Sequence, residues 1–270
     1  MVIMKNTKIF IQHKNRSLLK LSGGDVETFL QGLVTNDVNQ LTTQAVIFSC
    51  FLTGNGRFLY DFFLFKIGDD IIIDIISEDL AALRSRFNMY KLRSDVQLVE
   101  ITGYEVYQIL NHDELVLESD DIFTIFQDPR NSALGYRAYS KDKDALIKEG
   151  FYEENRDYYQ YLRIKNKIVE GEDLIKEKSI ILEYGYKQQS AISFDKGCYL
   201  GQELITRTER LGEIRKKLIY LNFTNKLSEN QIEILHQVKA KIIVSVAYSN
   251  KYHYLIIAKH TESEIISLLA

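Results

Sequence analysis

The order of short elements in the first hundred residues most constrains how this chain can fold. From Ser17 to Val99 the spacing of apolar residues predicts a strand, a helix, a hairpin, a strand, a helix and a strand in succession. The hairpin is marked by the turn Thr53-Gly54-Asn55-Gly56, because Asn and Gly tolerate the positive φ that tight turns need. This succession predicts an α+β fold with mostly antiparallel strands.

The remainder of the chain predicts two further parts. A second β-rich block is followed by two expected helices, over Lys141–Gly150 and Glu153–Lys167. Short strands dominate from Leu218 onward, and the chain has no internal repeat. We therefore expect three parts: residues 1–100 as a first α+β lobe, residues 101–217 as a second, and residues 218–270 as a small β-domain.

Composition narrows the class of protein. A net charge of -3 and a pI near 6.0 give no global electrostatic case for nucleic-acid binding. Two cysteines can neither build a disulfide framework nor complete a four-thiolate metal site, and the five histidines show no metal-ligand spacing. No apolar run approaches the length of a membrane span, and the first sixteen residues lack a secretion signal. We expect a cytoplasmic protein that holds no metal of its own.

The densest chemistry lies in one segment, Lys196-Gly197-Cys198-Tyr199-Leu200-Gly201-Gln202-Glu203. Its two glycines let the backbone bend on either side of Cys198, and a helix is expected from Gln202. The unpaired amides of that helix, together with Lys196, would lower the pKa of the thiol and favour nucleophilic, redox or metal-ligand chemistry. A tight turn around a buried, inert thiol explains the same residues, and on composition alone it is the more frequent case.

Asp61 is the second candidate for chemistry. Alternation along the expected strand puts it on the same face as Leu59 and Phe63, so its carboxylate needs partners if that face is buried. An acid at a sheet edge or turn explains Asp61 equally well.

A basic strip follows the cysteine segment. It could be a solvated surface, or it could capture an anionic group such as a ligand's acidic tail or a phosphate. The strip comprises Arg207, Arg210, Arg215, Lys216 and Lys217.

The segment Lys196–Glu203 resembles the signature of the folate-binding YgfZ-type proteins, which act in tRNA modification and iron–sulfur maintenance and have a mitochondrial counterpart. Further similar islands follow the family's order, at residues 29–38, 56–61, 128–137 and 207–217. The family in turn resembles the aminomethyltransferase (T-protein) of glycine cleavage. The resemblance therefore implies an aminomethyltransferase-like fold, with two α+β lobes and a small C-terminal domain in a ring-like arrangement around bound tetrahydrofolate.

The resemblance also implies a set of folate contacts. Glu183 stands where the family has a carboxylate for the pterin ring, although Ile181 replaces the usual proline before it. Asp61 lies near the aspartate that orients the reactive folate nitrogen in the aminomethyltransferases. The candidate cofactor-binding residues are Glu183, Tyr161, Arg163, Arg207, Tyr199 and Gln202.

Three functions of different class follow from the resemblance. The first is a tetrahydrofolate-binding accessory factor for assembly or repair of iron–sulfur clusters, which supports tRNA-modifying enzymes and has Cys198 and Lys196 at its reactive rim. Its partners would be iron–sulfur proteins or their assembly machinery, without direct nucleic-acid binding. The alternative is a folate-dependent aminomethyl transferase with Asp61 as its catalytic acid; a folate-binding module without chemistry is a third. An Asp61 carboxylate in the same cavity as Glu183 favours the transferase, whereas Cys198 at an open rim favours the cluster role.

Overall fold

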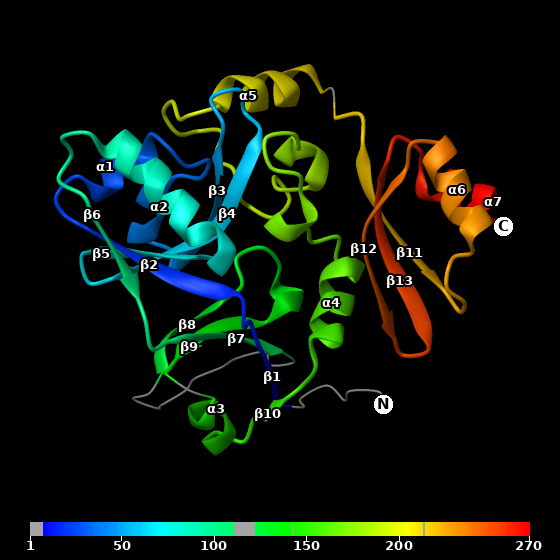
Figure 1. Ribbon diagram of the computed structural model, residues 1–270, viewed down its shortest axis with the longest axis horizontal. Coiled ribbons are helices and arrows are strands. Elements are labelled where there is room, and N and C mark those ends of the chain that lie inside the picture. Colours follow the sequence, from blue (N-terminus) through cyan, green and yellow to red (C-terminus); the bar gives the residue numbers. More distant parts are fainter. Residues whose placement is uncertain (1–7, 111–121, 142, 213) are drawn as a thin grey trace.

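The protein is an α+β molecule built around three sheets (Figure 1). The computed structural model describes residues 8–110, 122–141, 143–212 and 214–270. Its strands are β1 (Ile9–Gln12), β2 (Arg16–Ser22), β3 (Val46–Leu52), β4 (Phe58–Ile67), β5 (Asp70–Ile76), β6 (Gln97–Ile101), β7 (Glu105–Leu110), β8 (Ile122–Gln127), β9 (Tyr136–Ser140), β10 (Tyr152–Glu153), β11 (Lys217–Phe223), β12 (Lys241–Tyr248) and β13 (Lys251–Ala258). Its α-helices are α1 (Val26–Gln31), α2 (Ser77–Lys91), α3 (Asp144–Lys148), α4 (Arg156–Lys165), α5 (Gln202–Leu211), α6 (Glu229–Gln237) and α7 (Glu262–Leu269). Four 3₁₀ helices join them, η1 (Val38–Thr42), η2 (Ser132–Leu134), η3 (Gly171–Asp173) and η4 (Ile181–Tyr184).

The first sheet has the strand order β3-β4-β5-β2-β6, and all its neighbours are antiparallel. The predicted hairpin is confirmed, with Cys50 of β3 opposite Asp61 of β4. Helices α1 and α2 cover one face, where Phe29 and Phe87 pack against the sheet in one core. The other face turns toward the rest of the molecule and is also buried, which is why β3 is buried along its whole length.

The second sheet has the order β10-β1-β7-β9-β8, with β1 and β10 parallel and the other neighbours antiparallel. Strand β1 therefore lies in this sheet although it precedes β2 of the first sheet in the chain. The division into lobes at residue 100 stays a prediction, but the chain enters the second sheet before it builds the first. The expected helices before and after β10 are confirmed as α3 and α4.

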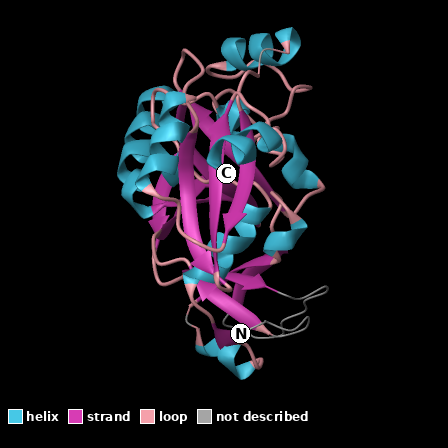
Figure 2. Cartoon of the chain, turned by 90° about the vertical axis from the view of Figure 1, so that its right-hand side faces the viewer, coloured by secondary structure: helices cyan, strands magenta, loops and turns pink. Residues whose placement is uncertain are grey.

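The third sheet, β11-β13-β12, lies beside α4 and faces the viewer in Figure 2. The sequence pattern predicted strands here and missed two helices, α6 and α7. Each begins with a capping box, Ser228 with Gln231 and Thr261 with Glu264, in which the two side chains satisfy each other's backbone amides. That spacing is a sequence signal for both helices. None of the helices in the described residues is long and apolar enough to cross a membrane.

One buried carboxylate joins the first sheet to the second. Asp74 of β5 accepts hydrogen bonds from Arg16 Nε of β2 at 2.6 Å, and from Arg137 Nε and Tyr139 Oη of β9 at 2.6 and 2.7 Å. Burial alone would raise the pKa of Asp74, but the two arginines outweigh it and lower the pKa to about 2. Asp74 is therefore charged at neutral pH and holds two sheets through one side chain.

Replacing Asp74 with Asn should lower the free energy of unfolding by about 3–5 kcal/mol, because the buried Arg137 guanidinium loses its counter-charge. The matched control is Asp70→Asn, which removes a partly exposed partner of Lys20 at 3.1 Å and should change the same free energy by less than about 1 kcal/mol. Urea denaturation at pH 7 measures both. Equal losses in the two variants would contradict a special role for Asp74.

Candidate functional site

A cavity of about 340 Å³ lies where η4, the residues after α4 and the start of β11 meet. Its walls combine apolar side chains such as Leu182 and Leu218 with the carboxylate of Glu183. Gly185 ends η4 with φ of +75°, and a Cβ there would meet Leu218 at 3.0 Å, so the turn is suited to glycine. Lys216 Nζ lies 3.2 Å from Glu183 Oε2. The volume and mixed lining fit a small-molecule site.

Gln189 is a wall residue of this cavity that sequence reasoning missed. Its side chain is 2% exposed, and neither its amide nitrogen nor its amide oxygen has a hydrogen-bond partner among the described residues. Buried amides in folded proteins are nearly always paired, so this one is an exception, and both of its polar atoms have almost no accessible surface. No sequence signal marks it, since a glutamine after a glycine turn is ordinary.

Asp61 lies in a second, much smaller cavity of about 20 Å³, which has room for about one water molecule. The carboxylate is 5% exposed and accepts a hydrogen bond from Tyr186 Oη at 2.7 Å. Gly171 closes over it, because a Cβ at that residue would fall 2.5 Å from Asp61 Oδ1. Strand β4 lies between β3 and β5, so the interpretation of Asp61 as an edge or turn-facing acid is wrong.

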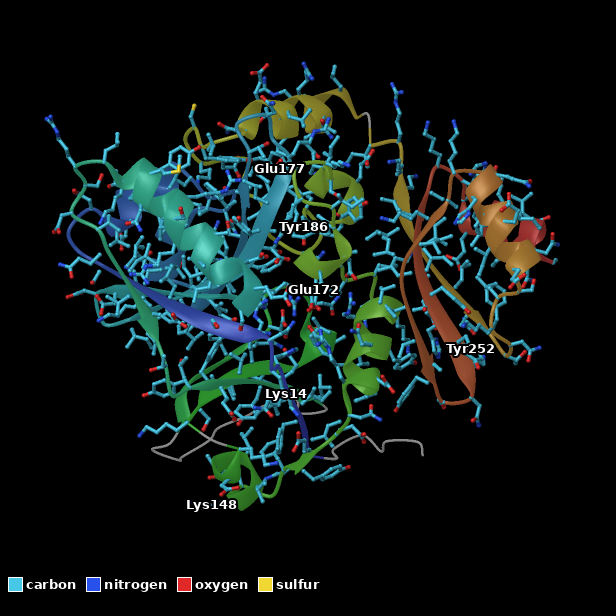
Figure 3. The ribbon with its side chains drawn as sticks, in the orientation of Figure 1. Lys14, Lys148, Glu172, Glu177, Tyr186 and Tyr252 are labelled. Carbon is cyan, nitrogen blue, oxygen red and sulfur yellow. The ribbon has the colours of Figure 1, made fainter. Side chains whose placement is uncertain are left out.

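Burial raises the pKa of Asp61 from 3.8 to about 6, although Arg16 and the Tyr186 hydroxyl act in the opposite direction. Tyr186 and Glu172 both lie in the middle of the molecule, where the first two sheets approach α4 (Figure 3). Asp61 is therefore a buried carboxyl group that can take up a proton near neutral pH.

Arg130 forms the wall between the two cavities. Its guanidinium lines both, and it donates to Asp128 Oδ2 at 2.8 Å and to Glu170 Oε1 at 3.0 Å. The ring of Phe63 lies under it, with its centroid 4.9 Å from Cζ. Arg130 is buried and paired on several sides. Its side chain therefore keeps the cavity of Asp61 separate from the cavity of Glu183.

Cys198 is exposed and lies in an open groove that runs along α5, together with Arg207 and Arg210. The expectation of a helix from Gln202 is confirmed, and the thiol is exposed, so the expectation of a buried cysteine is wrong. Across the described residues, no three or more His, Cys, Asp or Glu side chains are grouped so that they could hold a metal ion.

Gly201 explains why the cysteine segment needs glycine. Its φ is +81°, and a Cβ there would lie 2.4 Å from the carbonyl oxygen of Thr53 and 3.0 Å from Cα of Gly56. The segment therefore packs backbone to backbone against the turn of the β3–β4 hairpin. This contact fixes the start of α5 and, with it, the position of Cys198.

The Lys196 side chain is turned inward and holds the cysteine segment in place. Burial lowers the pKa of its ammonium group to about 8, and Nζ donates to the carbonyl oxygens of Val34 at 2.8 Å and Asn36 at 2.7 Å. The ring of Tyr199 lies beside it, with its centroid 5.2 Å from Nζ. Lys196 thus ties the cysteine segment to the loop after α1.

The other predicted folate contacts are divided among three places. Tyr161 packs against Tyr248 and His253 of the third sheet, with ring centroids 4.8 and 4.7 Å apart. Arg163 donates to Asp173 Oδ2 at 2.6 Å, and neither Tyr161 nor Arg163 lines the cavity of Glu183. Arg207, Tyr199 and Gln202 line the groove of Cys198. The basic strip is likewise split, since Lys216 and Lys217 line the Glu183 cavity.

Known proteins resemble this chain in sequence and in fold. No protein-family model matches the chain. It is 30% identical over 254 residues to the mitochondrial iron–sulfur cluster assembly factor IBA57 homolog of Dictyostelium discoideum, covering 79% of this chain and 62% of that protein. It is 31% identical over 227 residues to the mitochondrial factor IBA57 of Mus musculus, covering 75% and 63%. The chain is thus similar in sequence to iron–sulfur cluster assembly factors. It spans a little over three fifths of the length of these two relatives.

The fold has a counterpart among solved structures. The glycine cleavage system aminomethyltransferase T from Bartonella henselae superposes with a TM-score of 0.65 over 93% of this chain and 78% of that one, at 10% sequence identity. This likeness confirms the predicted aminomethyltransferase-like α+β fold.

The prediction of a cytoplasmic protein is wrong, because the relatives that are similar in sequence are mitochondrial proteins. The prediction used two cysteines and the lack of an apolar span. Those features separate oxidising from reducing compartments, but they do not distinguish one reducing compartment from another.

Replacing Asp61 with Asn should change how stability depends on pH. Since the folded state binds the Asp61 proton more tightly than the unfolded chain, the contribution of Asp61 to wild-type stability falls as pH rises from about 4 to about 6. The Asn variant lacks that loss, so its stability relative to wild type should rise by up to about 3 kcal/mol across this window. Chemical denaturation at pH 4, 5, 6 and 7 measures the difference. A difference that does not vary with pH would contradict the raised pKa.

Proposed function

We propose that this protein is a tetrahydrofolate-binding accessory factor for the assembly or repair of iron–sulfur clusters, and that Cys198 is its transient cluster ligand. The observation that carries the proposal is the separation of sites. Cys198 is exposed in an open groove, whereas Asp61 is buried in a small cavity that Glu183 does not line. The similarity to iron–sulfur cluster assembly factors supports the same role.

The cavity of Glu183 suits a folate. A pterin is a flat ring with an amide-like edge, and the Glu183 carboxylate can accept from its donor nitrogens. Leu182, Ile168 and Leu218 supply apolar surface for the ring, and Lys216 and Lys217 supply positive charge for an acidic tail. When bound, tetrahydrofolate offers nitrogens that can carry one-carbon units.

The groove of Cys198 suits brief contact with a cluster. One thiolate cannot hold an iron–sulfur cluster, so the other ligands come from a partner protein or a small thiol. On binding, the thiol gives up its proton and its sulfur takes one ligand position on iron. Arg207 and Arg210 in the same groove favour a thiolate-ligated, anionic cluster. We propose that the clients include enzymes that modify tRNA and depend on such clusters.

The aminomethyl transferase is the weaker alternative. It has one observation in its favour, the raised pKa of Asp61, which suits a general acid. A transferase needs that acid beside the folate nitrogen, and the Asp61 cavity has room for about one water molecule. Arg130 also stands between Asp61 and the cavity of Glu183.

Titration with tetrahydrofolate under anaerobic conditions should show saturable binding. Glu183→Gln should weaken it about 10- to 100-fold, because a charge-assisted hydrogen bond to the pterin is lost. The control Glu177→Gln changes an exposed acid that pairs with Arg86 and should leave the affinity unchanged. Wild-type affinity in Glu183→Gln would exclude this carboxylate as the pterin partner.

Cys198→Ala should abolish complementation of a strain that lacks this protein, measured as the activity of a cluster-dependent enzyme. Folate affinity and thermal stability should stay at wild-type values, since the side chain is exposed and lies outside the Glu183 cavity. Thr206→Ala alters the same groove without touching the sulfur, and it should complement. Full complementation by Cys198→Ala would remove the thiol from the function.

A further inference from the structure

Glu183 and Lys216 present an acceptor and a donor side by side in the proposed ligand cavity. Both residues line it, and Lys216 Nζ lies 3.2 Å from Glu183 Oε2. Their side chains are 19% and 40% exposed, so a ligand can reach both. The pair also has unused capacity, because Glu183 Oε1 accepts no hydrogen bond from the described residues and an ammonium group has three hydrogens. A ligand can therefore join this pair without breaking it.

The pair matches one edge of a pterin ring. Along that edge the 2-amino group and N3–H are donors, and the 4-oxo group next to N3 is an acceptor. The two carboxylate oxygens of Glu183 can accept from the 2-amino group and from N3–H, and the ammonium group of Lys216 can donate to the 4-oxo group. This edge is the same in every oxidation state of the ring, so the match holds for tetrahydrofolate.

We infer that Lys216 donates to the 4-oxo group of the pterin and thereby fixes which way round the ring lies on Glu183. The inference rests on the proposed folate site and deepens it. A carboxylate alone accepts the 2-amino group and N3–H in two orientations, which differ by a half-turn of the ring about the carboxylate axis. Lys216 lies on the Oε2 side and favours the orientation with the 4-oxo group there. N5, which neighbours the 4-oxo group and can carry a one-carbon unit, then lies on the same side.

The two lysines of the cavity thus take different roles. Lys216 pairs with Glu183 and lies at the edge of the ring. Lys217 lines the same cavity and has no ion-pair partner among the residues that the structure describes. It is therefore the lysine that is left for the acidic tail of the ligand.

Ligands that differ only at position 4 test the contact. In 4-amino analogues such as aminopterin, N3 carries no hydrogen, and the 4-amino group is a donor that would face the ammonium group. Aminopterin can also turn over and present N1 and N8 in place of N3 and the 4-oxo group, so it is a poor probe. In 5,8-dideaza analogues position 8 is C–H, which accepts no hydrogen bond. The 5,8-dideaza forms of folic acid and aminopterin are therefore the matched pair of ligands.

Calorimetry at pH 7 should give dissociation constants for both ligands. Lys216→Met should weaken binding of the 4-oxo ligand about tenfold, because a charge-assisted hydrogen bond is lost. The same variant should bind the 4-amino ligand as tightly as wild type or more tightly, because a repelling charge is removed. Lys216→Arg keeps a donor and should bind the 4-oxo ligand within about threefold of wild type. Lys217→Met should weaken binding of both ligands by the same factor, since both carry the same tail.

The inference would be overturned if Lys216→Met changed the two affinities by the same factor, or if it left the affinity for the 4-oxo ligand unchanged. Either result would leave the folate site intact. Absence of saturable binding of tetrahydrofolate and of the 4-oxo ligand to wild type would instead remove the proposed folate site, and the inference with it.

Discussion

The ion pairs of Asp74 set the relation between the two larger sheets, and the small cavity of Asp61, which has walls from both sheets, depends on that relation. Arg137, which reaches Asp74 from the second sheet, lies over the ring of Phe63 with its Cζ 4.3 Å from the centroid. Arg130 lies over the same ring at 4.9 Å and separates Asp61 from the cavity of Glu183. A buried ion pair adds less net stability than its Coulomb attraction suggests, but breaking one leaves a charge in the core. The arrangement therefore favours one placement of the sheets over others.

In the cysteine segment, the residues that fix the backbone differ from the residue proposed as the cluster ligand. Gly201 allows the segment to touch the hairpin turn, and Lys196 binds the carbonyl oxygens of Val34 and Asn36. These contacts hold the segment from two sides, so the backbone around Cys198 has little freedom to adapt. The thiol remains exposed at the start of α5. A ligand on a fixed backbone suits the brief capture of a cluster, since little conformational entropy is lost on contact.

The local sequence pattern predicted the helices and strands well, whereas contacts between residues distant in sequence determine which side chains form the site. The β3–β4 hairpin, α2 and α5 follow from apolar spacing and turn residues. The pairing of Glu183 with Lys216 spans 33 residues, and the unpaired state of Gln189 exists only once its neighbours are placed, so neither is visible in sequence. Tyr161 resembles a ligand contact in type, but the third sheet packs against α4 and takes up its ring. Residue type alone does not say which neighbour a side chain will meet.

The separation of the sites also limits how folate could influence cluster chemistry. The groove of Cys198 and the cavity of Glu183 share no wall residue among those the structure describes, so a ligand in the cavity does not touch the thiol. Helix α5 nevertheless packs on η4, because Ile205 lies in one buried core with Leu182 and Tyr184. If a ligand repositioned Glu183 and with it η4, the packed Ile205 would be the contact through which that movement reached the helix that begins beside Cys198. Coupling between the two sites therefore has to pass through this contact or through a change in the mobility of α5, since direct chemistry between folate and thiol would need a shared wall.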